Sequence, residues 1–144
     1  MPDSHPRFSE AASLTSEIIS AAIDVHRSMG PGLLESIYEW CLLQELNLRG
    51  FDTSNQKTVI VRYKQFQRED TLRFDIAVNG CVLIEIKAVQ EILPIHKAQL
   101  LSYMKLLDMP IGLLINFHKE KLRDGLSRLI LAGAGDLTES QPYQ

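Results

Sequence analysis

The feature that most constrains this chain is the stretch 74–87, in which two apolar runs flank the dipeptide Asn79-Gly80. Asn-Gly between apolar runs is a strong signal for a β-hairpin, and the nearly unbroken second run predicts a central strand buried on both faces. Glu85 and Lys87 lie two residues apart in that run, so their side chains point to the same face. Burying two charged groups there is costly unless they pair or bind something.

The length of the hairpin loop decides whether Asp75 joins Glu85 and Lys87. With a two-residue loop Asp75 would face away from Glu85, because side chains alternate along a strand. We therefore predict a three-residue loop with Gly80 in the left-handed region, or a bulge. Two carboxylates in a dry site repel, which raises the pKa of one of them unless a cation lies between them. Oxygen ligands favour Mg²⁺ or Mn²⁺ over zinc; the alternative is a structural ion pair of Lys87 with either acid.

Composition is that of one ordinary globular domain, with 144 residues of which 45% are hydrophobic. No apolar run approaches the roughly 20 residues that cross a bilayer, and the polar N-terminus has no signal-peptide core, so we expect a cytoplasmic protein. The formal net charge of −3 does not indicate a strong nucleic-acid binder. Residues 57–73, however, hold five basic and two acidic side chains, either as a phosphate-binding surface or as a solvated face.

Apolar periodicity and turn residues divide the chain into three helices, four strands and a short final piece. In order, these are helices 15–28 and 34–48, strands 58–66, 72–78 and 81–88, helix 94–107, strand 111–117 and a final piece 125–131. A helix separates the last two strands, which predicts that they pair in parallel. This order predicts an α/β domain in which helices flank a mixed sheet.

The two ends of the chain differ from its middle in composition. Residues 1–12 are polar and contain two prolines, which predicts a flexible N-terminal arm. We expect a single domain at 13–131 and a loose tail at 132–144.

Two predicted helices carry further residues that could belong to a functional site. Glu35 lies in the first turn of a predicted helix and Tyr38 follows on the same face; they are either site residues or a helix-start acid and a core aromatic. Gln99 and Tyr103 share one stripe of the helix 94–107, and such a polar stripe usually faces solvent.

The segment 32–38, with the sequence Gly-Leu-Leu-Glu-Ser-Ile-Tyr, matches the signature of the GxxExxY protein family. Segments 30–35, 74–88 and 113–117 also resemble that family, and the resemblance extends over residues 18–131. The family is similar to the PD-(D/E)XK nuclease superfamily. This implies a restriction-endonuclease-like αβββαβ core, here with an extra N-terminal helix.

The resemblance also implies roles for individual residues. Asp75, Glu85 and Lys87 match the superfamily's metal-dependent phosphodiesterase site, although Phe74 stands where many members have proline. Glu35 matches the acid that many members carry on the preceding helix. The implied ligands of the ion are the side chains of Asp75, Glu85 and Glu35 and the backbone carbonyl of Ile86. Gln99 and Tyr103 match a Gln-x-x-x-Tyr motif, and with Tyr38 they are expected to bind substrate.

The implied function is Mg²⁺-dependent hydrolysis of nucleic-acid phosphodiester bonds in repair, recombination or defence, with Mn²⁺ as a substitute ion. DNA is the expected substrate rather than RNA, and a homodimer would let so small a domain span a duplex. The alternative is a catalytically silent nuclease-fold module that binds nucleic acid or a protein partner, because a fold does not carry its function automatically.

Overall fold

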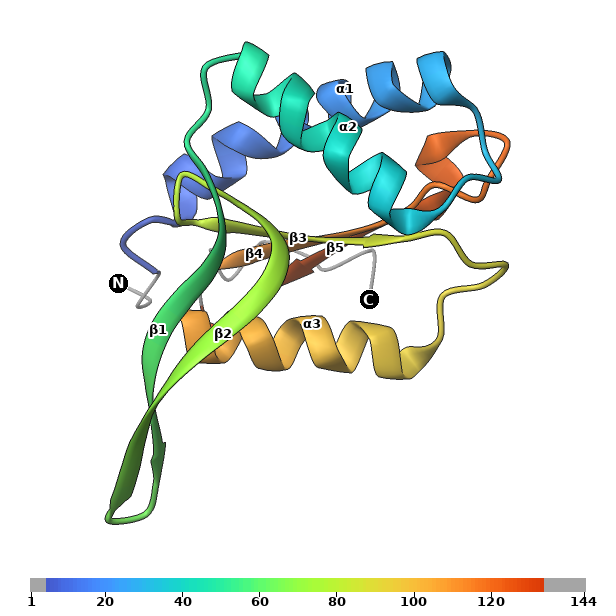
Figure 1. The fold of residues 1–144 in the computed structure, drawn as a ribbon. Helices are drawn as coiled ribbons and strands as arrows, with labels where there is room; N and C mark the ends of the chain where they lie inside the picture. The colour runs from blue at the N-terminus through green and yellow to red at the C-terminus, as the bar shows by residue number, and fades with distance from the viewer. Residues whose placement is uncertain (1–4, 134–144) are drawn as a thin grey trace.

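The computed structural model describes residues 5–133 and has, within them, three α-helices, a 3₁₀ turn and one five-stranded sheet (Figure 1). In chain order the elements are α1 (Phe8–Met29), α2 (Glu35–Leu48), β1 (Thr53–Tyr63), β2 (Phe66–Val78), β3 (Val82–Lys87), α3 (Pro94–Leu107), β4 (Ile111–Asn116), η1 (Leu122–Gly125) and β5 (Leu126–Ile130). None of the helices in this part of the chain has both the length and the apolar character needed to cross a membrane.

The strands lie in the sheet in chain order, β1-β2-β3-β4-β5. All neighbouring pairs are antiparallel except β3 and β4, which are parallel. The helix α3 makes the crossover between those two strands, as a parallel pair requires. The predicted α/β architecture with a mixed sheet is therefore confirmed.

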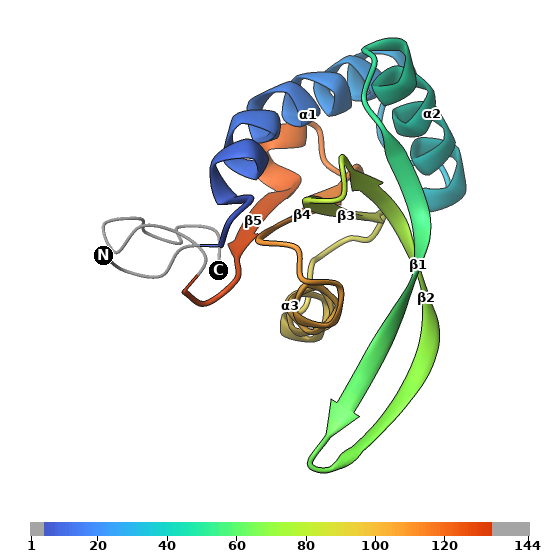
Figure 2. The same cartoon turned by 90° about the vertical axis from the view of Figure 1, so that its left-hand side faces the viewer.

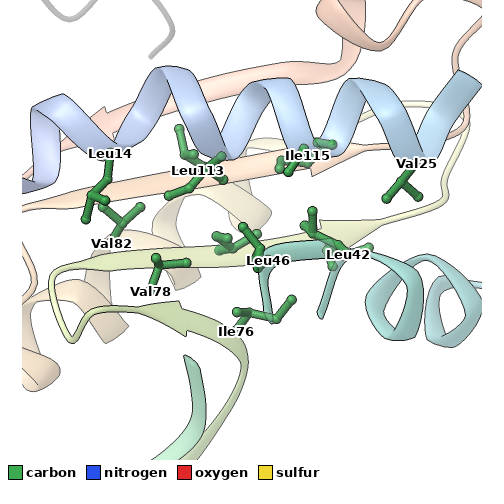
Figure 3. Packing of buried hydrophobic residues seen from close by; sticks show 14 of the residues in the cluster. Leu14, Val25, Leu42, Leu46, Ile76, Val78, Val82, Leu113 and Ile115 are labelled. Carbon is green, nitrogen blue, oxygen red and sulfur yellow. The ribbon is translucent and has the colours of Figure 1, made fainter. Parts of the chain in front are cut away.

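Helices α1 and α2 cover one face of the sheet and α3 covers the other, as both views show (Figures 1 and 2). The strand β3 alternates between these layers: Ile84 and Ile86 pack with α1 and α2, whereas Leu83 packs with α3. The larger apolar cluster lies under α1 and α2, and Figure 3 labels Leu14, Val25, Leu42, Leu46, Ile76, Val78, Val82, Leu113 and Ile115 in it.

Helix α1 begins at Phe8, earlier than the predicted start at Thr15, so residues 8–12 are helical and do not belong to a flexible arm. The reason is tertiary: Ala11 is fully buried in the core, and Arg7 donates a hydrogen bond of 2.6 Å to the carbonyl of Asn79. The rest of the predicted arm and tail falls largely on residues 1–4 and 134–144, which lie outside the described range.

The hairpin formed by β1 and β2 is longer than the sequence predicted. The sequence predicted a turn at 67–70, between the strands 58–66 and 72–78, but these residues are strand. The chain turns instead at Lys64-Gln65, where Lys64 has a positive φ of 55°. The pairs Ile60–Glu69 and Val61–Arg68 belong to a ribbon that is largely exposed on both faces. Residues 67–71 are all polar, so this part of β2 lacks the apolar alternation by which a half-buried strand is recognised.

Candidate active site

The loop between β2 and β3 has the predicted odd length. Val78 pairs with Val82, which leaves Asn79, Gly80 and Cys81 in the loop, and Gly80 has a φ of 67°. This register puts Asp75 on the same side as Glu85, where its Oδ2 accepts a hydrogen bond of 2.7 Å from the backbone N–H of Ile86.

The strand β2 is also irregular on its other edge, beside Asp75. Ser54 of β1 pairs with Ala77 and Gln56 pairs with Arg73, so residues 74–76 lie opposite a single residue of β1. A bulge of this kind bends the strand and re-aims side chains. Its consequence here is that the three consecutive residues Arg73, Phe74 and Asp75 all line one pocket.

Glu85 and Lys87 form the ion pair that their spacing allows, with 3.6 Å between Nζ and Oε2. Their side chains are 33% and 18% exposed, so the charges are only partly screened by water. The pKa of Glu85 is raised to about 7, chiefly by burial and then by the charge of Asp75, while Lys87 acts in the opposite direction. At neutral pH, Glu85 is therefore poised between its charged and neutral forms.

Glu39 of α2, which was not among the predicted site residues, joins this group. Its pKa is raised to about 7, chiefly by burial and in addition by a hydrogen bond to Asp75 and the charges of Asp75, Glu85 and Glu35. Its position four residues after Glu35 was the available signal, because residues at that spacing share a helix face. Four carboxylates from α2, β2 and β3 thus interact with one another.

The end of β3 is anchored from two sides. Glu35 accepts a hydrogen bond of 3.1 Å from the backbone N–H of Ala88. The fully buried Asn116 holds Val89 by accepting from its N–H at 3.1 Å and donating to its carbonyl at 2.8 Å. These contacts keep the chain immediately after Lys87 in place, which holds the adjoining charged side chains in position.

A pocket of about 280 Å³ opens between the sheet and α3. Asp75 and Glu85 line it from the sheet, and Gln99 and Tyr103 line it from α3, so the predicted polar stripe faces the two acids. The pocket walls also include the side chains of Arg73, Phe74, Leu83, His96 and Leu100. A larger pocket of about 650 Å³ between α1 and the strands β4 and β5 has no carboxylate in its lining and offers no comparable chemistry.

Tyr38 does not reach this pocket, which corrects its expected contact with substrate. The side chain is fully buried and stacks on Phe117 with 4.5 Å between ring centroids. Its hydroxyl donates to the carbonyl of Gly30 and accepts from the N–H of Leu33 at 3.1 Å. Tyr38 therefore holds the connection between α1 and α2, which explains the tyrosine in the segment 32–38 by packing.

The acidic group has the chemistry of a hard-cation site. Its donors are carboxylate oxygens, which suit Mg²⁺ or Mn²⁺. The pKa values of Glu39 and Glu85 are raised first by burial and then by the charge of neighbouring carboxylates, a repulsion that a divalent cation would relieve. Within residues 5–133, no three His, Cys, Asp or Glu side chains already converge as ligands of one ion. The residues thus fit a divalent cation in type and charge.

Comparisons with known proteins agree with the fold. A family model described as the PD-(D/E)XK nuclease superfamily matches residues 12–129. A search of curated proteins found no significant match. The crystal structure of a protein named SSO0001 aligns with a TM-score of 0.50 at 20% identity, and the alignment covers 88% of this chain and 62% of that one. At this identity the structural likeness concerns the fold alone.

Proposed function

The chain belongs to the PD-(D/E)XK nuclease superfamily, and from this premise we propose that it hydrolyses nucleic-acid phosphodiester bonds with Mg²⁺, or with Mn²⁺ in its place. One observation carries the proposal: Asp75 and Glu85 share a pocket with Gln99 and Tyr103, and Lys87 is paired with Glu85. The match to the superfamily supports a nuclease-like function. We further propose that the ion is Mg²⁺ or Mn²⁺, that DNA is the preferred substrate and that two copies of the chain act as a homodimer.

The residues that would hold the ion are Asp75, Glu85 and the carbonyl of Ile86, with Glu35 completing the set. A bound divalent cation supplies a Lewis acid for the phosphoryl oxygen and lowers the pKa of an attacking water. Glu39 adds a further carboxyl group, which is hydrogen-bonded to Asp75.

Lys87 is the residue that would orient the attacking water and stabilise the negative charge that develops on phosphorus-bound oxygen. Its side chain is 18% exposed, and a cation in such a site acts more strongly on a developing charge than one in open water. Gln99 and Tyr103 would hold phosphates beside the scissile bond, and Arg73 adds a cation to the same pocket from the sheet. Positioning is their main contribution, because small displacements of reacting groups cost about a hundredfold in rate.

The decisive experiment compares the wild type with Asp75→Ala on single-stranded, duplex and branched DNA and on RNA, with Mg²⁺ or Mn²⁺ present. We expect cleavage by the wild type and a loss of about a hundredfold or more in the variant, since a ligand of the ion is removed. Asp124→Ala in η1, away from the pocket, is the matched control and should cleave normally. Cleavage of none of these substrates by the wild type would contradict the nuclease proposal.

A binding module without catalysis is the competing function. The observation that favours it is that the described carboxylates are not already arranged as three ligands of one ion. Calorimetric titration of Mn²⁺ in the presence of an oligonucleotide separates the two functions. Binding of Mn²⁺ that disappears in Asp75→Ala supports the nuclease, whereas an oligonucleotide complex that takes up no Mn²⁺ supports the module.

A further inference from the structure

The distal part of the β1–β2 hairpin, residues 58–71, projects past α3 and away from the rest of the domain (Figures 1 and 2). We refer to these residues as the hairpin arm. A two-stranded ribbon contributes little core of its own and is marginally stable when isolated. The hairpin arm therefore extends the molecule beyond its core, and the side chains on the surface of the arm indicate which ligands it can contact.

The tip of the hairpin arm presents two aromatic rings to solvent. Tyr63 and Phe66 are paired directly across the ribbon and are 66% and 62% exposed. The Nζ of Lys64 lies 5.2 Å from the centroid of the Tyr63 ring, so a cation and ring faces are presented together. Large exposed aromatics beside cations suit nucleotides, because bases stack on the rings while cations meet phosphates.

The charge of the tip is complementary to a polyanion. Residues 62–68 contain Arg62, Lys64 and Arg68 and no acidic residue. Of these three, Arg68 pairs with an acidic side chain, Asp70, with 2.7 Å between Nε and Oδ2. The pocket, by contrast, is rich in carboxylates, which repel phosphate in the absence of a cation. Basic groups at a distance from the pocket would then supply the general affinity for a phosphate backbone.

The aromatic side of the hairpin arm is continuous with the side that holds the pocket. Tyr63 lies two residues from Val61 on β1 and so shares its face, and Val61 packs on the apolar cluster under α3. Asp75 lies nine residues after Phe66 on β2, which sets an upper limit of about 30 Å between them. A nucleic-acid strand with stacked bases, at roughly 3.4 Å per nucleotide, would span this distance with about nine nucleotides.

We propose that the tip of the hairpin arm binds unpaired nucleotides of the strand whose backbone enters the pocket. Bases stack on Tyr63 and Phe66, and Arg62, Lys64 and Arg68 contact phosphates. Single strands are favoured over duplex, because every unpaired base exposes a ring face whereas a duplex buries its ring faces in its own stack. The inference takes its ligand class, nucleic acid, from the proposed function and adds a second contact region and a preferred substrate form.

The test measures binding in EDTA, so that cleavage plays no part in the result. Fluorescence anisotropy follows a labelled single-stranded oligonucleotide long enough to span both sites, and a duplex of the same length. For Tyr63→Leu/Phe66→Leu we expect the affinity for the single strand to fall about tenfold or more, because the stacking faces are lost. Tyr63→Phe/Phe66→Tyr keeps both rings and should bind like the wild type.

The matched control is Trp40→Leu on α2, which removes another exposed aromatic far from the hairpin arm and should leave binding unchanged. Circular dichroism checks that all variants remain folded. Unchanged single-strand affinity in the folded leucine variant would overturn the inference, as would an equal loss for duplex and single strand. If the protein binds single strands through Tyr63 and Phe66 but cleaves no nucleic acid, this inference is supported and the nuclease proposal is contradicted. The two proposals can therefore fail separately.

Discussion

On one face of β3, the side chains of Val82, Ile84 and Ile86 are at most 1% exposed and pack against α1 and α2. On the other face, Leu83 packs under α3, and Glu85 and Lys87 follow it toward the pocket. The two faces belong to the same six residues, and only the alternation of side chains separates them. Apolar burial on the first face holds the strand in place while the second face holds charged groups that oppose folding.

The largest effect on stability should come from the apolar face. Ile84→Ala leaves a cavity in the main core, and we expect it to lower the free energy of unfolding by about 3 kcal/mol. Ile95→Ala on α3, where the side chain is largely exposed, is the matched control and should change it by less than about 0.5 kcal/mol. Urea denaturation measures the free energy of unfolding of both variants. Equal losses in the two variants would contradict the assignment of Ile84 to the core and Ile95 to the surface.

A smaller loss is expected from Tyr38→Phe. This change leaves the carbonyl of Gly30 and the N–H of Leu33 without their hydroxyl partner, at a cost of about 1–2 kcal/mol. The cleavage rate under folded conditions should stay the same, since the hydroxyl does not reach the pocket. A large fall in rate with unchanged stability would mean that Tyr38 contacts substrate after all.

The effect on the charged face should differ from these two in kind, because it depends on pH. The pKa of Glu85 in the folded protein is about 7 against an ordinary value of 4.5, so folding favours its protonated form. Without divalent cations, the stability from this group is therefore complete below about pH 4.5 and is lost as the pH rises through about 7. Thermal unfolding in EDTA should show Tm falling across that window.

Glu85→Gln sharpens this prediction, because the amide cannot ionise. The variant should lose part of the decline in Tm between these pH values and should be at least as stable as the wild type at pH 8. Glu39 contributes the remaining part, since its pKa is also raised to about 7. Added Mn²⁺ should raise the Tm of the wild type more at high pH than at low pH, because binding requires the ionised carboxylates. A wild-type Tm that is flat with pH would contradict the account of the charged face.

Local sequence patterns were sufficient to predict the central hairpin. Asn79-Gly80 between apolar runs located the turn, and the requirement that Asp75 and Glu85 share a face gave its odd length, because side chains alternate strictly along a strand. The crossover through α3 similarly predicted the parallel pair of β3 and β4. The finer resemblance to the GxxExxY family and the roles of the individual site residues stay predictions.

The sequence by itself thus determined the mixed α/β sheet and the acids and lysine that its central hairpin carries, since both follow from side-chain periodicity over a few residues. Only the tertiary structure decided which partners those groups meet. Contacts between distant segments bring Glu39 to Asp75, put the ring of Tyr38 on Phe117 and extend α1 back to Phe8. The physical reason is that burial and charge interaction depend on separation in space, which no local pattern encodes.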